Sequence, residues 1–143
     1  MAANTLDTFY VLLTNVSKQD QEVFETWNSW GYYAVSFELR TDDERIVTIT
    51  KKPVGFTRNG STTFVISPDA QMVYPNKLDK AWDAASPLPT ADEQPVDVTV
   101  KAIYEIKRTR ESTQQHVWTG RVESMVYHFM FRHWSEHSAA SKR

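Results

Sequence analysis

The segment 96–107, VDVTVKAIYEIK, constrains the fold of this chain more than any other stretch of its sequence. Apolar and polar side chains alternate along it, which is the pattern of a β-strand with one buried face. The apolar positions are Val96, Val98, Val100, Ala102, Tyr104 and Ile106, the polar ones are Asp97, Thr99, Lys101, Glu105 and Lys107, and Ile103 is the exception. The pattern predicts a long strand in a sheet that covers a core with one face.

A second strand is predicted over about 117–134, after the polar connection RTRESTQQ, and we expect it to pair back onto the first. Gly120 is expected to mark a bulge in it. Met125, Tyr127, Phe129 and Phe131 would share one face, and Val126, His128, Met130 and Arg132 the other. Because both faces are bulky, we expect the core to cover one of them and a helix, a partner subunit or a ligand to cover the other.

A helix is the alternative structure for the same segment. Its stripe would contain Val122, Met125, Val126, Phe129, Met130 and His133. The β-branched and aromatic content favours the strand. A helix would leave one ordinary buried face and would remove much of the case for a partner.

Two helices are predicted in the first 30 residues from apolar spacings of three and four. The first spans 5–13, with a strand as the alternative, and the second spans 18–30. The first stripe consists of Leu6, Phe9, Tyr10 and Leu13, and the second consists of Val23, Phe24, Trp27 and Trp30. SKQD at 17–20 resembles a capping box, and Gly31 is well placed as the C-cap of the second helix.

Two β-hairpins are predicted next. Over 32–52, the alternating segment YYAVSFELR and the β-branched segment RIVTITKK flank the turn residues TDDE. Asn59 and Gly60 lie between VGFT and STTFVI. Asn-Gly is a strong signal for a hairpin turn because both residues tolerate positive φ.

These elements predict an α+β fold in a single domain, 1–143: one antiparallel sheet of about six strands, with the N-terminal helices and one short inserted helix packed on one face. The inserted helix is expected over 76–85, capped by Asn76. SPLPTADEQP at 86–95 is expected to be a proline-rich loop, and 138–143 a flexible tail.

Composition excludes several classes of chemistry. The chain has no cysteine, which rules out disulfides, thiolate catalysis and Cys-based zinc sites. The first residues lack the basic and apolar regions of a signal peptide, and no apolar run reaches the length of a membrane span. We therefore expect a soluble chain, cytoplasmic or otherwise intracellular, with no membrane partner. No glycine-rich phosphate loop and no nucleophile motif is present, so no cofactor is expected.

The histidines do not form a pattern that would hold a metal ion. His128 and His133 would point to opposite faces of a strand, so they cannot share a metal. His133 and His137 could share a face, but a zinc site needs three or four converging ligands. No metal site is predicted.

The charges are distributed unevenly although the net charge is only −2. Residues 1–95 carry 8 basic and 13 acidic side chains, whereas residues 96–143 carry 8 basic and 5 acidic ones. Lys101, Lys107, Arg108 and Arg110 form a candidate patch for an anionic partner, with aromatic residues interleaved as in nucleic-acid-binding proteins. Phosphate affinity comes mainly from concentrated positive charge, whereas the whole chain is slightly acidic. Nucleic-acid binding is therefore only the second alternative.

The leading hypothesis is a non-catalytic binding or assembly protein that associates with itself or enters a larger complex through its aromatic C-terminal strand. Aromatic residues, Met and Arg are enriched at protein interfaces. The candidate interface residues are Tyr127, Phe129, Phe131, Arg132 and Trp134. The first alternative is a small-molecule-binding protein, or an isomerase, cyclase or dehydratase, with Tyr104 and His128 in an aromatic cavity. Whether the chain is an enzyme stays open, although the residues favour a protein without catalytic activity.

Overall fold

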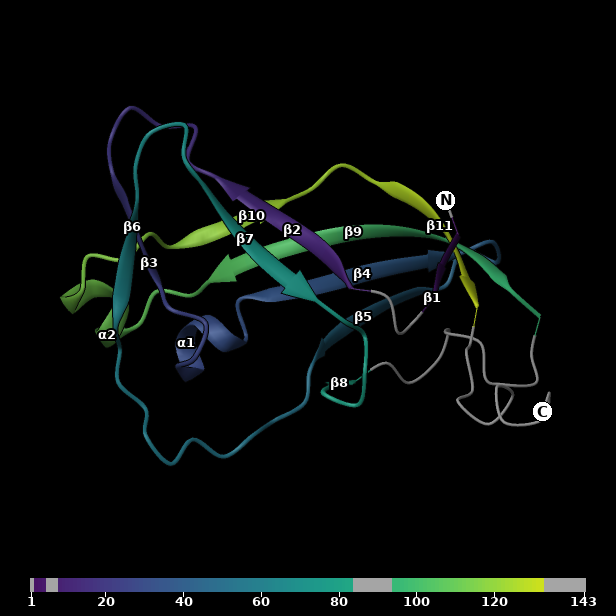
Figure 1. Ribbon diagram of the computed structural model, residues 1–143, viewed down its shortest axis with the longest axis horizontal. Helices are drawn as coiled ribbons and strands as arrows, with labels where there is room; N and C mark the ends of the chain where they lie inside the picture. Colours follow the sequence, from purple (N-terminus) through teal and green to yellow (C-terminus); the bar gives the residue numbers. More distant parts are fainter. Residues whose placement is uncertain (1, 5–7, 84–93, 133–143) are drawn as a thin grey trace, which may run out of the picture.

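The computed structural model describes residues 2–4, 8–83 and 94–132, which form two layers of β-structure (Figure 1). The strands are β1 (Ala2–Asn4), β2 (Phe9–Thr14), β3 (Gln21–Phe24), β4 (Val35–Thr41), β5 (Ile46–Lys51), β6 (Thr63–Ile66), β7 (Gln71–Asn76), β8 (Trp82–Asp83), β9 (Val96–Ile106), β10 (Gly120–Glu123) and β11 (Tyr127–Arg132). The helices in this part of the chain are α1 (Ser29–Tyr32) and α2 (Arg110–Gln114).

The first layer is a seven-stranded sheet built around β9. This strand pairs antiparallel with β4 along one edge and with both β10 and β11 along the other. Beyond β4 the sheet continues through β5 to β8, and beyond β11 it ends at the short parallel strand β1. The alternation predicted for 96–107 is confirmed, because Val98, Val100, Tyr104 and Ile106 are all buried.

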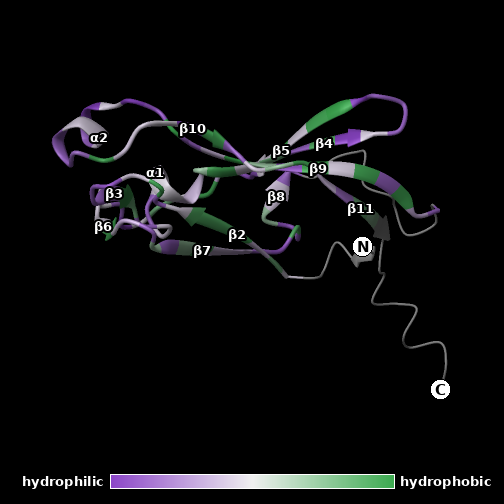
Figure 2. Cartoon of the chain, turned by 90° about the horizontal axis from the view of Figure 1, so that it is seen from above, coloured by the Kyte–Doolittle hydropathy of each residue, from purple (hydrophilic) through white to green (hydrophobic). Residues whose placement is uncertain are grey.

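The second layer is a two-stranded ribbon in which β2 pairs with β7 and β3 pairs with β6. A buried side chain, Asn15, forms the corner between the two halves of the ribbon. Its amide nitrogen donates hydrogen bonds to the carbonyl oxygens of Gln19 and Ile66, at 2.7 and 2.8 Å. Seen from the edge of the sheet, the ribbon lies as a separate layer along one face (Figure 2).

The core fills the space between sheet and ribbon. Phe37 of β4 is 1% exposed, and its ring meets Phe9 of β2 edge-on at a centroid distance of 5.2 Å. The Phe37 ring also lies 5.3 Å from the ring of Trp82 in β8. Leu39 and Ile49 are fully buried beside it. Apolar burial on both layers therefore fixes the ribbon to the sheet.

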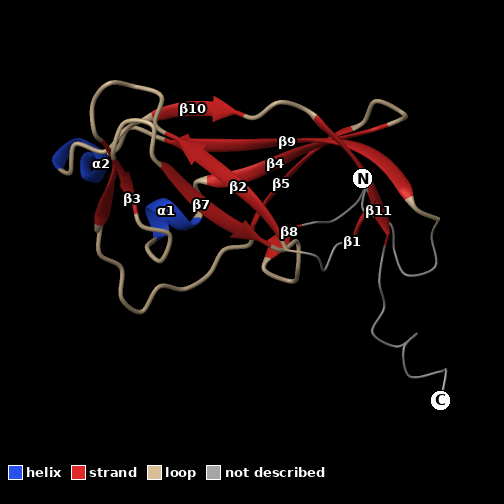
Figure 3. Ribbon diagram, turned by 45° about the horizontal axis from the view of Figure 1, so that its top comes forward, coloured by secondary structure: helices blue, strands red, loops and turns tan. Residues whose placement is uncertain are grey.

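The predicted α+β fold with one antiparallel sheet is wrong, because about half of the described residues are in strands of several sheets and the two helices have only four and five residues (Figure 3). Residues 9–14 form a strand rather than part of a helix over 5–13. Phe9, Val11 and Leu13 pack towards the core, while Tyr10 and Leu12 are 63% and 55% exposed. The same apolar residues fit both periods, and contact with the sheet favours the period of two.

The helix predicted over 18–30 is also wrong, since β3 occupies 21–24 and α1 starts only at Ser29. Ser17 does not cap a helix, because its backbone N–H donates to the Asn15 Oδ1 in a local turn. The helix α1 is capped by Asn28, whose Oδ1 accepts from the Gly31 N–H at 3.0 Å. Gly31 is thus an internal, buried residue of α1 rather than a C-cap.

The hairpin predicted over 32–52 is confirmed as β4 and β5, with Phe37 opposite Ile49 and Arg40 opposite Ile46. The hairpin predicted at Asn59-Gly60 is wrong, because β6 pairs with β3 and 52–62 is a loop. The Asn59 side chain instead accepts a hydrogen bond from the Ser29 N–H and donates one to the Ser29 Oγ.

The helix predicted over 76–85 is replaced by the end of β7, a turn and β8. Asn76 does not act as an N-cap, because its side-chain amide donates to the Tyr74 carbonyl oxygen at 2.8 Å. Most of the predicted loop at 86–95 and the whole predicted tail at 138–143 lie outside the described residues.

Candidate functional site

The C-terminal segment is extended, as predicted, but it is divided into two strands by a β-bulge. In β10, Glu123 lies opposite Ile103 of β9, whereas in β11 Tyr127 lies opposite Val100. The register therefore shifts by one residue, and Met125 and Val126 together stand opposite Lys101. The bulge lies at 125–126 rather than at Gly120, where it was predicted.

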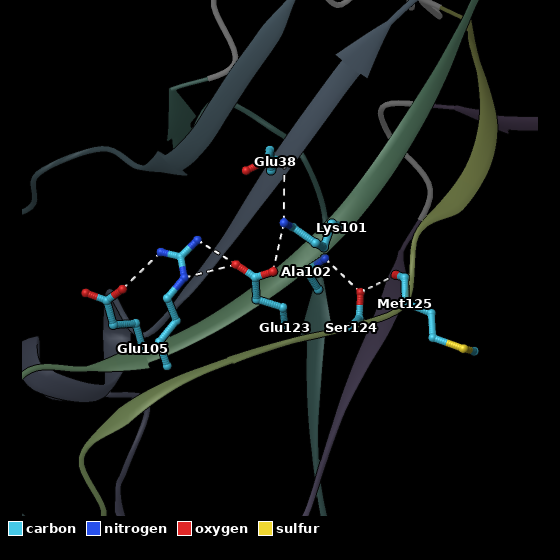
Figure 4. A network of polar contacts seen from close by, with 8 residues as sticks. Glu38, Lys101, Ala102, Glu105, Glu123, Ser124 and Met125 are labelled. Carbon is cyan, nitrogen blue, oxygen red and sulfur yellow. Dashed lines mark hydrogen bonds and ion pairs between the residues drawn. The ribbon is translucent and has the colours of Figure 1, made fainter.

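Ser124 fixes the start of the bulge (Figure 4). Its backbone N–H donates to the Ala102 carbonyl oxygen at 2.9 Å, and its Oγ accepts from the Ala102 N–H at 3.0 Å. The same hydroxyl donates to the Met125 carbonyl oxygen at 2.6 Å. These bonds hold the backbone at the bulge, so the apolar side chains that follow are presented on a defined support.

An exposed apolar surface follows the edge of the sheet at this bulge. Its members are Val122, Met125, Val126 and Tyr127, which are 42%, 75%, 57% and 50% exposed. We call these four residues the edge surface. Within the described chain, β10 pairs on one side only, with β9, so its other side is a free strand edge. Free edges present unpaired backbone groups that can pair with another strand.

A network of ion pairs covers the outer face of the sheet beneath the edge surface (Figure 4). The Lys101 ammonium lies 2.8 Å from Glu123 and 3.5 Å from Glu38. Arg121 contacts Glu105 at 3.1 Å and Glu123 at 2.9 Å. The hydrogen bond from Lys101, with that from Arg121 second, lowers the pKa of the Glu123 carboxyl. Glu123 is therefore ionised at neutral pH and holds two cations in place.

A pocket of about 350 Å³ opens between the ribbon and β10. Val23, Ile66, Tyr104 and Trp118 are among the residues that line it, together with more exposed residues such as Leu12, Val16 and Val122. The backbone N–H of Trp118 donates to the Glu22 carbonyl oxygen at 2.8 Å, and this bond ties the chain before β10 to the ribbon. The lining is mainly apolar, as is typical of small-molecule and side-chain pockets.

Two buried tyrosine hydroxyls lie at the base of this region. The rings of Tyr74 and Tyr104 are 5.7 Å apart, and both side chains are nearly inaccessible to water. Their hydroxyls lie near each other but without the geometry of a hydrogen bond, and neither has another partner in the described chain. Burial raises the pKa of both phenols, because a phenolate would lose its hydration in the core.

Replacing both tyrosines by phenylalanine is expected to leave the free energy of unfolding at pH 7 unchanged or raised, since unpaired buried hydroxyls are lost. In the wild type, the contribution of the two buried phenols to the free energy of unfolding is fully present below pH 10, the ordinary tyrosine pKa. It is lost above pH 10, because there only the unfolded chain ionises at these tyrosines. The slope is about 1.4 kcal/mol per pH unit for each buried phenol. Urea unfolding between pH 8 and about pH 11 measures this dependence, which should be flatter in the double variant. Tyr10→Phe, at an exposed site, should keep the wild-type slope.

The predicted interface residues lie partly on this surface. Tyr127 belongs to it, and Phe129 is half-buried and packs against the core. Phe131 and Arg132 belong to β11, and Trp134 lies outside the described residues. Val126, Tyr127 and His128 are exposed within the described chain, so cover of this part of the strand by a partner or a ligand stays a prediction.

The residues predicted for other partners are not brought together. Lys101 lies on the outer face of β9 among acids, while Lys107, Arg108 and Arg110 are exposed in the connection to α2 and in its first residue. Tyr104 lines the pocket, whereas His128 stands opposite Thr99 and is exposed on the other face of the sheet.

Three residues of this region were not predicted as site residues from the sequence: Arg121 and Glu123 at the free edge and Trp118 in the pocket. The signal for the edge was present in GRVE, where opposite charges flank an apolar residue. In the described part of the chain, no three His, Asp or Glu side chains are grouped so that they could hold a metal ion. Among the same residues, no helix is long and apolar enough to cross a membrane.

Comparisons with known proteins found no match: no protein-family model fits the chain, and no curated protein or solved structure is significantly similar to it.

Proposed function

We propose that this chain is a non-catalytic assembly protein that associates through the edge surface and the free edge of β10. The observation that carries the proposal is the coincidence of an unpaired strand edge with four exposed apolar side chains, Val122, Met125, Val126 and Tyr127. Exposed apolar residues are ordinary when they are scattered, but a contiguous group is typical of an interaction site. A backbone that is already fixed also reduces the conformational entropy that is lost on binding.

The surroundings of the edge surface support the same function. The ion pairs of Lys101, Arg121 and Glu123 lie on the outer face, so they leave the apolar residues uncovered. The pocket next to Val122 offers room for side chains of a partner. Interfaces commonly combine an apolar centre with a charged rim, and this part of the sheet has both.

Assembly predicts that the wild-type chain forms a species larger than 16.5 kDa in a concentration-dependent way. Met125→Ser/Val126→Ser should weaken self-association about tenfold or more, because two exposed apolar contacts are lost. Size-exclusion chromatography with light scattering over a range of loading concentrations measures both. Val65→Ser is the matched control, since Val65 is similarly exposed but lies in the ribbon. A wild-type chain that stays monomeric at every concentration would contradict the proposal.

Binding of a small apolar molecule is the second candidate function, and the pocket beside Trp118 favours it. In that case a monomeric chain would take up an apolar probe, and the fluorescence of Trp118 would change as the probe binds.

A further inference from the structure

We propose that β10 pairs with β10 of a second copy of this chain, antiparallel and around a two-fold axis that passes beside Val122. This inference rests on the proposed function and names the partner and the register of its contact. It joins the two seven-stranded sheets edge to edge into one continuous sheet.

The backbone of β10 presents the required hydrogen-bonding groups. The Ser124 N–H is bonded to β9, and Val122 lies opposite Tyr104 in the same register. Since N–H and C=O groups alternate in direction along a strand, those of Val122 face β9 and those of Arg121 and Glu123 face the free edge. Two outward-facing residues separated by one inward-facing residue can form two hydrogen-bonded pairs around a two-fold axis.

The charges of β10 are complementary to themselves in this register. With Val122 opposite the partner's Val122, Arg121 stands opposite the partner's Glu123, and Glu123 stands opposite the partner's Arg121. Both side chains lie on the outer face of the sheet and keep exposed fractions of 47% and 38% within one chain, so each can reach across the axis. Opposite charges at directly paired positions stabilise antiparallel strands.

The neighbouring registers are excluded by the same charges. A shift of two residues in one direction would set Arg121 against the partner's Arg121, and a shift in the other direction would set Glu123 against the partner's Glu123. Like charges in directly opposed positions destabilise a strand pair. The sequence GRVE therefore selects a single in-register pairing of its own edge.

The apolar face of the pairing meets the pocket. Val122 is half-exposed on the core face at the mouth of the pocket, where Leu12 and Val16 of the ribbon are also exposed. In the proposed pairing, Val122 contacts the partner's Val122 in a non-hydrogen-bonded pair, in which side chains approach most closely. The pairing thus covers apolar surface that one chain leaves open to water.

Cross-linking provides the direct test, because the chain contains no cysteine. Residues in a non-hydrogen-bonded antiparallel pair have Cα atoms about 4.5 Å apart, which a disulfide can span. Val122→Cys should form a disulfide-linked dimer readily under mild oxidation. Val65→Cys is a control at a similarly exposed site, and Arg121→Cys is a control for register, since residue 121 faces residue 123 of the partner. Both controls should cross-link much more slowly.

A charge exchange tests the register independently of oxidation. Arg121→Glu and Glu123→Arg should each weaken self-association about tenfold or more, because both facing pairs become like-charged. The double variant R121E/E123R should restore it. An equal mixture of the two single variants should form mixed dimers, since all facing charges are then opposite. Arg110→Glu, which makes the same charge change at an exposed site away from β10, should associate like the wild type. Thermal unfolding checks that each variant folds.

The outcomes separate this inference from the function on which it rests. Self-association that survives both single charge variants, with no preference for cross-linking at position 122, overturns the β10 pairing and leaves assembly through another surface. A wild-type chain that is monomeric at every concentration overturns both. Rapid cross-linking of Val122→Cys, together with mixed dimers of the two single variants, establishes the proposed register.

Discussion

Gly31→Ala is expected to destabilise the chain by about 3 kcal/mol, because the added methyl group has no space. A Cβ at this position would lie 2.2 Å from the Glu25 carbonyl oxygen and 3.0 Å from that of Phe24. Both atoms belong to the backbone at the end of β3, which is held by its pairing with β6 and by the bond from the Glu25 N–H to the Thr62 carbonyl oxygen. The chain there cannot move without breaking the ribbon.

Gly55→Ala is the matched control for this substitution. A Cβ at Gly55 would meet nothing within 4 Å, and the backbone φ angle of Gly55 is not positive. Alanine should therefore leave stability unchanged or raise it by about 0.5 kcal/mol through the unfolded chain. Urea unfolding followed by circular dichroism measures both variants. Equal stability of the two would contradict the close approach of α1 to the end of β3.

Phe37→Ala is expected to cost about 4 kcal/mol, since it removes a large buried ring that contacts both layers. Phe37 meets Phe9 from the ribbon and Trp82 from β8, the last strand of the sheet. The loss would therefore loosen the ribbon as well as the sheet. Near-ultraviolet circular dichroism should lose part of the aromatic signal even where the variant remains folded, because Trp82 would lose a neighbouring ring.

Tyr10→Ala is the control for Phe37→Ala. Tyr10 follows Phe9 in the chain but is 63% exposed on the outer side of β2, so its removal should change stability by less than about 1 kcal/mol. In a helix over 5–13, Phe9 and Tyr10 would share the buried stripe. A large loss from Tyr10→Ala would favour that helix over the strand.

The parts of the fold that the sequence predicts are those with local pairing and one polar face. The hairpin of β4 and β5 has a short turn between an alternating segment and a β-branched one, and β9 carries a polar side chain at almost every second position. In both, the period of two is unambiguous because the solvent face is hydrophilic.

The ribbon could not be predicted in this way. Its strands pair 9–14 with 71–76 and 21–24 with 63–66, so no local turn marks them. Both faces of β2 are apolar, since Leu12 and Tyr10 point outward, and the helical and extended periods fit equally well. At the start of α1 the Ser29 N–H donates a hydrogen bond to the Asn59 Oδ1 in a distant loop, which no local pattern reveals.

The candidate site could be predicted only in part from the sequence. The aromatic strand drew attention to Tyr127, but the single extra residue at 125–126 decides which side chains are presented at the edge. A bulge of one residue leaves no periodic trace in a sequence this short, so Met125 and Val126 appeared only once the pairing with β9 was known.

The seven-stranded sheet has an open side at the four-residue strand β10. At its opposite side lies β8, which has two residues, and beyond β11 lies β1, which has three. Growth into a fibril needs two complementary open sides on every subunit, so that each added copy offers a fresh template. If the β10 edges of two copies satisfy each other, neither β10 edge stays open to a third copy, and association through this surface would terminate at a closed pair.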